Sequence, residues 1–137
     1  MRVEKTYSKP LIDKLGVKPG MRVAIVGPVD ADGSFRALLA ERTNDVTEGQ
    51  PLPDTDIVFL AADSEADLTG LDELRRRIRP NGAIWMISRK GRAATIRYAE
   101  LLEAARASGL VDNKVASFSD THTALRFVIR VELRASG

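Results

Sequence analysis

Two short apolar runs constrain the fold of this chain more than any other feature. The segments DIVFLAAD (residues 56–63) and AIWMISR (residues 83–89) are apolar on both alternating faces. A strand with two apolar faces must be covered on both sides, which is typical of the inner strands of a parallel sheet. Both runs are far shorter than the ~20 residues that a membrane-spanning helix needs. They therefore indicate a sheet with helices on both faces.

Strand patterns alternate with helix patterns along the rest of the chain. Strands are predicted over residues 21–27, 45–49, 56–63, 83–89, 114–118 and 124–131, and helices over residues 9–15, 34–42, 71–82 and 95–109. The segment Pro80-Asn81-Gly82 is expected to stop the third helix and turn the chain. The turn between the last two strands is too short for a crossover helix, so this pair must run antiparallel. With 137 residues and no linker or repeat, the chain is expected to form one α/β domain, 1–137.

Composition excludes several kinds of site. The chain has no cysteine, which rules out disulfides, thiolate metal ligands and cysteine nucleophiles, and its single histidine rules out a multi-histidine metal site. A net charge of +2, with basic and acidic residues interleaved, gives no basic face for nucleic acid. Residues 1–16 lack the continuous apolar stretch of a secretory signal, so we expect a cytoplasmic protein without a membrane segment.

The segment VAIVGPVDADGSF (residues 23–35) occupies a strand-to-helix turn of the kind that binds nucleotides in many α/β proteins. Asp30 and Asp32 would repel a phosphate, and no Gly-Lys-Ser/Thr follows, so a phosphate-binding loop is excluded. Two alternatives remain open: the two carboxylates hold a divalent cation, or Asp32 or Ser34 caps the following helix. Because capping explains these residue types without a ligand, we expect no metal.

Ligands of open α/β sheets bind beyond the carboxyl ends of the strands. Three of the predicted strands end near Gly27, Asp63 and Ser88 and should be neighbours, so these residues should share one edge of the sheet. The basic loop SRKGRAAT (residues 88–95) would then face acidic side chains, either to hold an anionic ligand or to pair with them. The candidate ligand-binding residues are Gly27, Pro28, Asp30, Glu48, Asp63, Ser88 and Lys90.

Three other features have structural explanations. The run RRRIR (residues 75–79) lies near a helix C-terminus, where cations suit the helix dipole, and no aromatic residues interleave for base stacking. Nucleic acid is therefore the least favoured partner. His122 falls in the last turn without a serine or cysteine motif to activate. Trp85 lies within an apolar strand and is expected in the core.

Two segments carry a resemblance to a known fold. LRRRIRPNGAIWMIS (residues 74–88) is similar to the helix, Pro-Gly-Gly turn and strand of class I S-adenosylmethionine-dependent methyltransferases, and LLEAARASGLVDNKVASF (residues 101–118) is similar to their last helix and penultimate strand. The resemblance implies a mostly parallel, Rossmann-like sheet with helices on both faces and a C-terminal antiparallel hairpin. The chain also resembles a family of small bacterial proteins catalogued as a domain of unknown function, through YSKPLIDKLGVKPGMRVAIVG (residues 7–27) and GLVDNKVASFSDTHTALRFV (residues 109–128).

The chain departs from the methyltransferase pattern at the cofactor loop. The family carries an acid inside the first strand and then Gly-x-Gly-x-Gly, and the matching positions here hold Ile25, Gly27, Val29 and Ala31. Glycines are needed where the backbone approaches a cofactor closely, and Val29 brings a branched side chain into that space. The resemblance makes Glu48 the acid that would bind a ribose, but the helix and strand that would complete the adenine side are missing. We therefore expect no cofactor and disfavour S-adenosylmethionine.

Three functions follow as hypotheses. The favoured one is a non-catalytic or regulatory domain that kept the scaffold, lost the cofactor loop, and binds a partner protein or further copies of itself. The alternative is a small-molecule or nucleotide binder, or a minimal enzyme, that uses the cleft with Asp30, Asp63 and Lys90. The third is a nucleic-acid-associated protein that uses the RRRIR run. Whether the chain is an enzyme stays open from the sequence.

Overall fold

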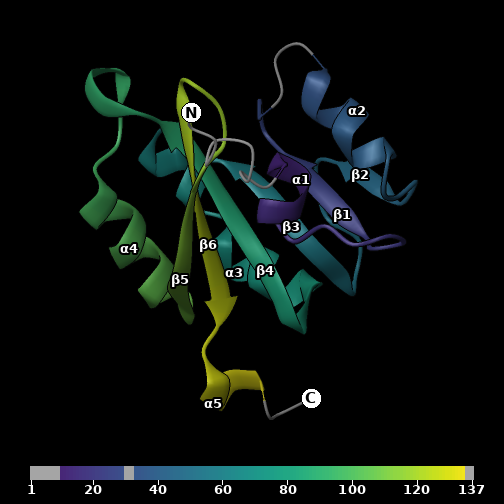
Figure 1. Cartoon of the computed structure of the whole chain (residues 1–137). Coiled ribbons are helices and arrows are strands. Elements are labelled where there is room, and N and C mark those ends of the chain that lie inside the picture. Colours follow the sequence, from purple (N-terminus) through teal and green to yellow (C-terminus); the bar gives the residue numbers. More distant parts are fainter. Residues whose placement is uncertain (1–9, 30–32, 135–137) are drawn as a thin grey trace, which may run out of the picture.

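The computed structural model describes residues 10–29 and 33–134, and within them six strands form one sheet (Figure 1). The strands are β1 (Val23–Val26), β2 (Val46–Glu48), β3 (Thr55–Ala61), β4 (Ile78–Arg89), β5 (Leu110–Ser117) and β6 (His122–Ile129). Their order in the sheet is β2-β1-β3-β4-β6-β5. The first four strands are parallel, and β6 runs antiparallel to both β4 and β5. The predicted, mostly parallel sheet with an antiparallel C-terminal hairpin is confirmed.

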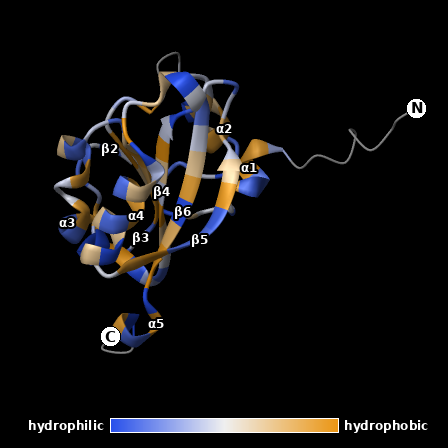
Figure 2. Cartoon of the chain, turned by 90° about the vertical axis from the view of Figure 1, so that its left-hand side faces the viewer, coloured by the Kyte–Doolittle hydropathy of each residue, from blue (hydrophilic) through white to orange (hydrophobic). Residues whose placement is uncertain are grey.

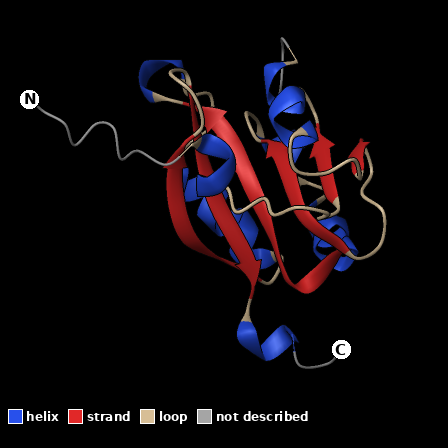
Figure 3. Cartoon of the chain, turned by 45° about the vertical axis from the view of Figure 1, so that its right-hand side comes forward, coloured by secondary structure: helices blue, strands red, loops and turns tan. Residues whose placement is uncertain are grey.

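Helices cover both faces of this sheet (Figure 3). The helices are α1 (Leu11–Lys14), α2 (Ser34–Ala40), α3 (Leu71–Arg77), α4 (Tyr98–Ala107) and α5 (Val131–Arg134), with 3-10 turns η2 (Glu65–Leu68) and η3 (Gly91–Ala93). α1 and α2 pack on one face, and α3 and α4 pack on the other. α5 follows β6 and lies beyond the end of the sheet (Figures 1 and 3). None of these described helices has the length and apolar character that crossing a membrane requires.

Each face of the sheet has its own apolar core, and apolar residues are concentrated along the inner strands (Figure 2). The α1–α2 side buries Ile12, Leu15, Phe35, Leu39, Phe59, Trp85 and Ile87. The α3–α4 side buries Leu71, Leu74, Ile84, Met86, Leu101, Leu125 and Phe127. Trp85 is fully buried, as predicted, and donates from Nε1 to the carbonyl of Leu15 at 3.1 Å. Because the indole N–H is satisfied there, the bond also fixes α1 on the sheet.

The helix predicted over residues 71–82 ends early, and the strand after it starts with a bulge. α3 ends at Arg77 because Ile78 has an extended backbone and pairs with Thr55 of β3. The register then shifts, so that residues 79–82 bulge out before regular pairing resumes. The Pro-Asn-Gly segment therefore forms an irregularity inside β4 rather than a turn before it, which is where sheets tolerate proline and glycine.

Three further boundaries differ from the prediction. α4 begins at Tyr98 because the preceding residue is still extended, and β6 ends at Ile129, before α5. β5 begins at Leu110 rather than at residue 114, since exposed polar residues on this end strand hide its pattern in the sequence.

The predicted helix caps differ as well. Gly33, with φ 81°, occupies the N-cap position of α2, so Ser34 is the first helical residue and not the cap. Asp32, the other predicted cap, lies outside the described residues.

We expect Gly82→Ala to destabilise the fold. A Cβ at Gly82 would lie 2.8 Å from the carbonyl oxygen of Asp56 and 3.1 Å from that of Arg79, both backbone atoms. Relieving such an overlap typically costs about 1–3 kcal/mol of the free energy of unfolding. Urea unfolding checks this, with Gly70→Ala as the control, since a Cβ at Gly70 meets nothing within 4 Å. Equal losses in the two variants would contradict the packing at the bulge.

Candidate functional site

Three of the strand ends that the sequence singles out lie side by side. β1, β3 and β4 are neighbouring parallel strands, with Val26 opposite Leu60 and Ala61 opposite Ile87. Gly27, Asp63 and Ser88 therefore share the C-terminal edge of the sheet. Glu48, at the end of β2, and Lys90, just after β4, lie at the same edge on either side of them.

The loop after β1 keeps one feature of a binding loop and lacks another. Gly27 has φ 82°, and a Cβ there would lie 3.2 Å from the Cβ of Ala61, so both the backbone and the space favour glycine. Pro28 is exposed, whereas Val29 is partly buried against the apolar core on the α1–α2 side. The branched side chain of Val29 thus packs against the core, at a position where the resemblance implies bare backbone. Asp30 lies outside the described residues.

Glu48 already has a partner within the chain. Its carboxylate forms an ion pair with Arg36 of α2. Both side chains are largely exposed, so the pair adds little to stability, but Arg36 competes with any ligand hydroxyl for this carboxylate. β2 is the end strand of the sheet, and residues 49–54 lead directly to β3 without a helix, as the sequence predicts.

Asp63 links the ends of β3 and β4. Its carboxylate accepts a hydrogen bond from the N–H of Arg89 at 3.2 Å, and its carbonyl accepts one from the hydroxyl of Thr95 at 2.5 Å. Its own N–H donates to the carboxylate of Asp67 at 2.9 Å. These bonds hold the loop after β4 against the end of β3, so Asp63 positions this loop from within the chain.

Ser88 and Lys90 lie at a more open part of the same edge. They line a pocket between the sheet and α4. The residue Ser88 is only 8% exposed, and its hydroxyl has no hydrogen-bond partner among the described residues. Lys90 donates from Nζ to the hydroxyl of Ser117 in β5 at 2.7 Å. The edge thus divides into a half that is tied by internal contacts and a half that contains an open pocket.

A known protein family shares the sequence pattern of this chain. The profile of the family described as "Protein of unknown function (DUF3052)" matches residues 12–131. The chain belongs to this family. The matched span runs from α1 to the start of α5 and includes all seven candidate ligand-binding residues. No curated protein sequence matches the chain.

Solved structures of methyltransferases share the fold of this family member. A SAM dependent methyltransferase from Aquifex aeolicus is 17% identical, with a TM-score of 0.66 over 92% of this chain and 89% of that chain. A protein from Sulfolobus solfataricus, assigned as a type 11 methyltransferase, is 14% identical, with a TM-score of 0.66 over 94% and 93% of the two chains. The structure of the Haloferax volcanii Trm112 methyltransferase activator in complex with a protein assigned as a methyltransferase matches at 14% identity and a TM-score of 0.61, over 88% and 87%. The likeness confirms the methyltransferase-like Rossmann fold.

The residues at the β1 and β2 ends do not fit S-adenosylmethionine in the way that the resemblance implies. Val29 packs into the core, Glu48 is paired with Arg36, and β2 is the last strand on the side where the adenine pocket would continue. The described residues contain no group of three or more histidine, aspartate or glutamate side chains that could hold a metal ion, and Asp30 and Asp32 lie outside them.

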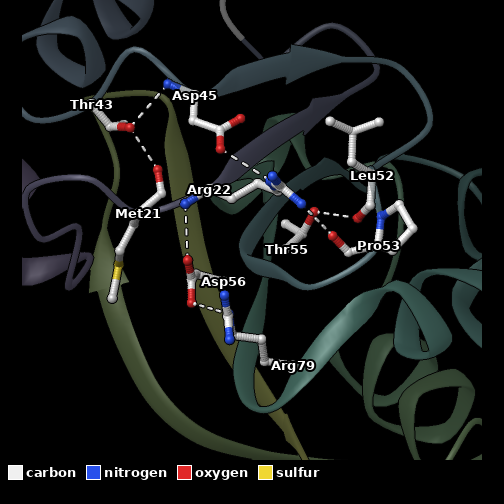
Figure 4. A network of polar contacts seen from close by, with 9 residues as sticks. All are labelled: Met21, Arg22, Thr43, Asp45, Leu52, Pro53, Thr55, Asp56 and Arg79. Carbon is white, nitrogen blue, oxygen red and sulfur yellow. Dashed lines mark hydrogen bonds and ion pairs between the residues drawn. The ribbon is translucent and has the colours of Figure 1, made fainter.

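A polar network at the opposite edge of the sheet has a structural role (Figure 4). Arg22, just before β1, donates from Nε to Asp45 at 3.0 Å and from Nη1 to the carbonyl of Pro53 at 2.6 Å. Its N–H donates to Asp56 at 2.9 Å, and Asp56 also pairs with Arg79 at 3.0 Å. These contacts tie the starts of β1, β2 and β3 to the bulge of β4.

Three arginines of the RRRIR run form ion pairs within the chain. Arg76 and Arg77 both form ion pairs with Glu73, at 3.3 Å and 3.0 Å, and Arg79 pairs with Asp56. Arg75 differs, because its Nε is buried against Gly109 and has no hydrogen-bond partner within the part of the chain that the structure describes. These contacts support the structural explanation of the run over a nucleic-acid interface.

Sequence reasoning missed the residues that shape the pocket. Val115 and Thr123 come from the C-terminal hairpin, and they line the pocket together with Ser88 because β6 inserts between β4 and β5. Polar residues near three strand ends were visible in the sequence. The register that aligns them was not, because a period-2 pattern fixes the face of a strand and not its partner.

The pKa of Glu100, at the start of α4, predicts a pH dependence of stability. The N–H of Arg97 donates to its carboxylate at 2.9 Å, and this hydrogen bond lowers the pKa of Glu100 below its ordinary value of 4.5, aided by the charge of Arg97 and opposed by desolvation. A lowered folded-state pKa stabilises the fold above about pH 4.5, and the stabilisation is lost as pH falls through the folded-state value. We expect the urea midpoint of Glu100→Gln to fall less than that of the wild type between pH 7 and about pH 3.5.

The matched control is Glu103→Gln, an exposed glutamate on the same helix without an ion pair among the described residues. Its acid sensitivity should equal that of the wild type. If Glu100→Gln lost stability in acid as steeply as Glu103→Gln, the capping role of Glu100 would be wrong.

Proposed function

We propose that this chain is a non-catalytic binding domain, residues 1–137, built on a methyltransferase-like scaffold that does not use S-adenosylmethionine. The observation that carries the proposal is the ion pair between Glu48 and Arg36. It occupies the one described acid that the resemblance assigns to the cofactor's ribose. The guanidinium of Arg36 carries a full positive charge and a ribose hydroxyl is neutral, so Arg36 competes with the hydroxyl for this carboxylate.

Two neighbouring features support the same conclusion. Val29 packs into the core beside the only matching glycine, Gly27, so the loop presents a side chain where a cofactor needs backbone. Asp63, the acid at the end of the next strand, is bonded to Arg89, the last residue of β4, and to Thr95 of the loop after it. The carboxylates of Glu48 and Asp63 are thus already bonded to other residues of the chain.

The partner-binding form of this proposal is supported by one structural neighbour. The Haloferax volcanii complex contains an activator protein beside a protein assigned as a methyltransferase, so this scaffold is found in a protein–protein complex. Pairing through sheet edges is the less favoured mode here. β2 has only three residues, and β5 is interrupted by a register shift next to Lys114, and both features discourage edge-to-edge pairing.

A second function, the binding of a small molecule, is favoured by a specific observation. Ser88 is nine-tenths buried, lines the pocket beside α4, and has no hydrogen-bond partner among the described residues. Among the described residues, Arg75 Nε is the one fully buried side-chain nitrogen or oxygen without a partner, so the Ser88 hydroxyl opens into the pocket and can bond a ligand group. A regulatory domain that responds to a ligand would unite the two functions.

Calorimetry tests the proposal directly. We expect no saturable heat when S-adenosylmethionine or S-adenosylhomocysteine is titrated into the protein up to about 1 mM, which bounds the binding free energy at about −4 kcal/mol. Binding at micromolar concentration that weakens in Glu48→Gln would contradict the proposal. Glu41→Gln is the matched control, since Glu41 is exposed at the end of α2, away from the strand ends.

A further inference from the structure

The pocket beside α4 has the size of a small-molecule site. Its volume is about 310 Å³, within the range of about 300–1,000 Å³ that is usual for such sites. It lies between the α3–α4 face of the sheet and the first turns of α4, and the loop after β4 borders it. The lining residues are Ser88, Arg89, Lys90, Gly91, Ala94, Ile96, Tyr98, Leu101, Val115, Thr123 and Leu125.

One end of the pocket is polar because of the sheet register. Thr123 of β6 stands opposite Ser88 of β4 on one side and opposite Ser117 of β5 on the other, so three hydroxyl residues form a row across the sheet. The ammonium group of Lys90 reaches this row and donates to Ser117 at 2.7 Å. Hydrogen-bond donors and one positive charge therefore converge at this end.

The other end of the pocket is apolar. The next row of the sheet places Leu125 beside Val115, and Ile96 and Leu101 close the wall from the side of α4. Val115 is 60% exposed and Tyr98 is 51% exposed, although most large apolar side chains of the described chain are buried. Apolar side chains left open around a pocket are typical of a ligand site.

We infer that this pocket binds an organic monocarboxylate, with its carboxylate at Ser88, Thr123 and Lys90 and its apolar body against Leu125 and Val115. The lining contains two cationic residues and no acidic one, which selects an anion. A carboxylate accepts from hydroxyl and ammonium donors at once, and its single charge matches the single ammonium at the row. The inference rests on the small-molecule form of the proposed function and adds the ligand class.

Backbone amide NMR tests this inference on the whole chain, with phenylacetate and hexanoate as probes and phenylacetamide as the neutral analogue. We expect saturable shifts at Ile96, Leu101, Val115 and Leu125 with both carboxylates, and at least about tenfold weaker binding of the amide, because hydrogen bonds to charged groups contribute more than neutral ones. Lys90→Gln should weaken carboxylate binding by a similar factor.

Two variants separate binding from folding. Ser88→Ala should weaken the binding of both carboxylates several-fold. It should leave the urea midpoint unchanged, because the Ser88 hydroxyl has no hydrogen-bond partner to lose among the described residues. Lys18→Gln, at an exposed lysine in the turn before β1, should bind as the wild type does.

The inference is overturned if neither carboxylate gives saturable shifts at the pocket, if the amide binds as tightly as phenylacetate, or if Lys90→Gln binds as the wild type does. A different result would contradict the proposed function, namely binding of S-adenosylmethionine with shifts at Gly27 and Glu48. The two failures are therefore distinguishable in the same spectra.

Discussion

The packing of β4 on both of its faces is the constraint on which the rest of the structure depends. Residues 83–87 are almost completely buried. Ile84 and Met86 pack in the core on the α3–α4 side, and Trp85 and Ile87 pack in the core on the α1–α2 side. One edge of β4 pairs in parallel with β3, and the other pairs antiparallel with β6. A strand with apolar side chains on both faces requires helices above and below it, so this short segment specifies the layered architecture. It also sets where Ser88 and the loop after it lie.

The polar residues at the two ends of the strands have different roles. At the edge where the strands begin, Arg22 and Asp56 join several chain segments through hydrogen bonds and ion pairs, which explains these charges without a ligand. At the edge where the strands end, contacts within the chain hold Glu48 and Asp63, whereas the pocket beside α4 stays open. The scaffold is that of methyltransferases, but the open part of its edge lies beside β4 and β6 rather than above β1. Under the proposed function, the shared fold carries no shared chemistry.

Much of the fold could be predicted from the sequence because its main signals are local. The apolar runs predicted the inner strands, and the short final turn predicted the antiparallel pair. The short segment after Glu48 predicted that no helix precedes β3. The bulge at the start of β4 could not be predicted, because it depends on the register with β3. The same holds for the site. Gly27, Asp63 and Ser88 were placed at one edge correctly, but the contribution of Thr123 and Val115 depends on the insertion of β6, a long-range pairing that no local pattern encodes.

The most direct test of this account is a crystal structure of the protein soaked with S-adenosylhomocysteine. The account predicts that Val29 stays packed in the core, that Glu48 stays paired with Arg36, and that no adenosyl group is ordered above β1. An adenosyl group seated over Gly27 with its ribose on Glu48 would contradict it. That result would make the chain a cofactor-binding member of the methyltransferase fold.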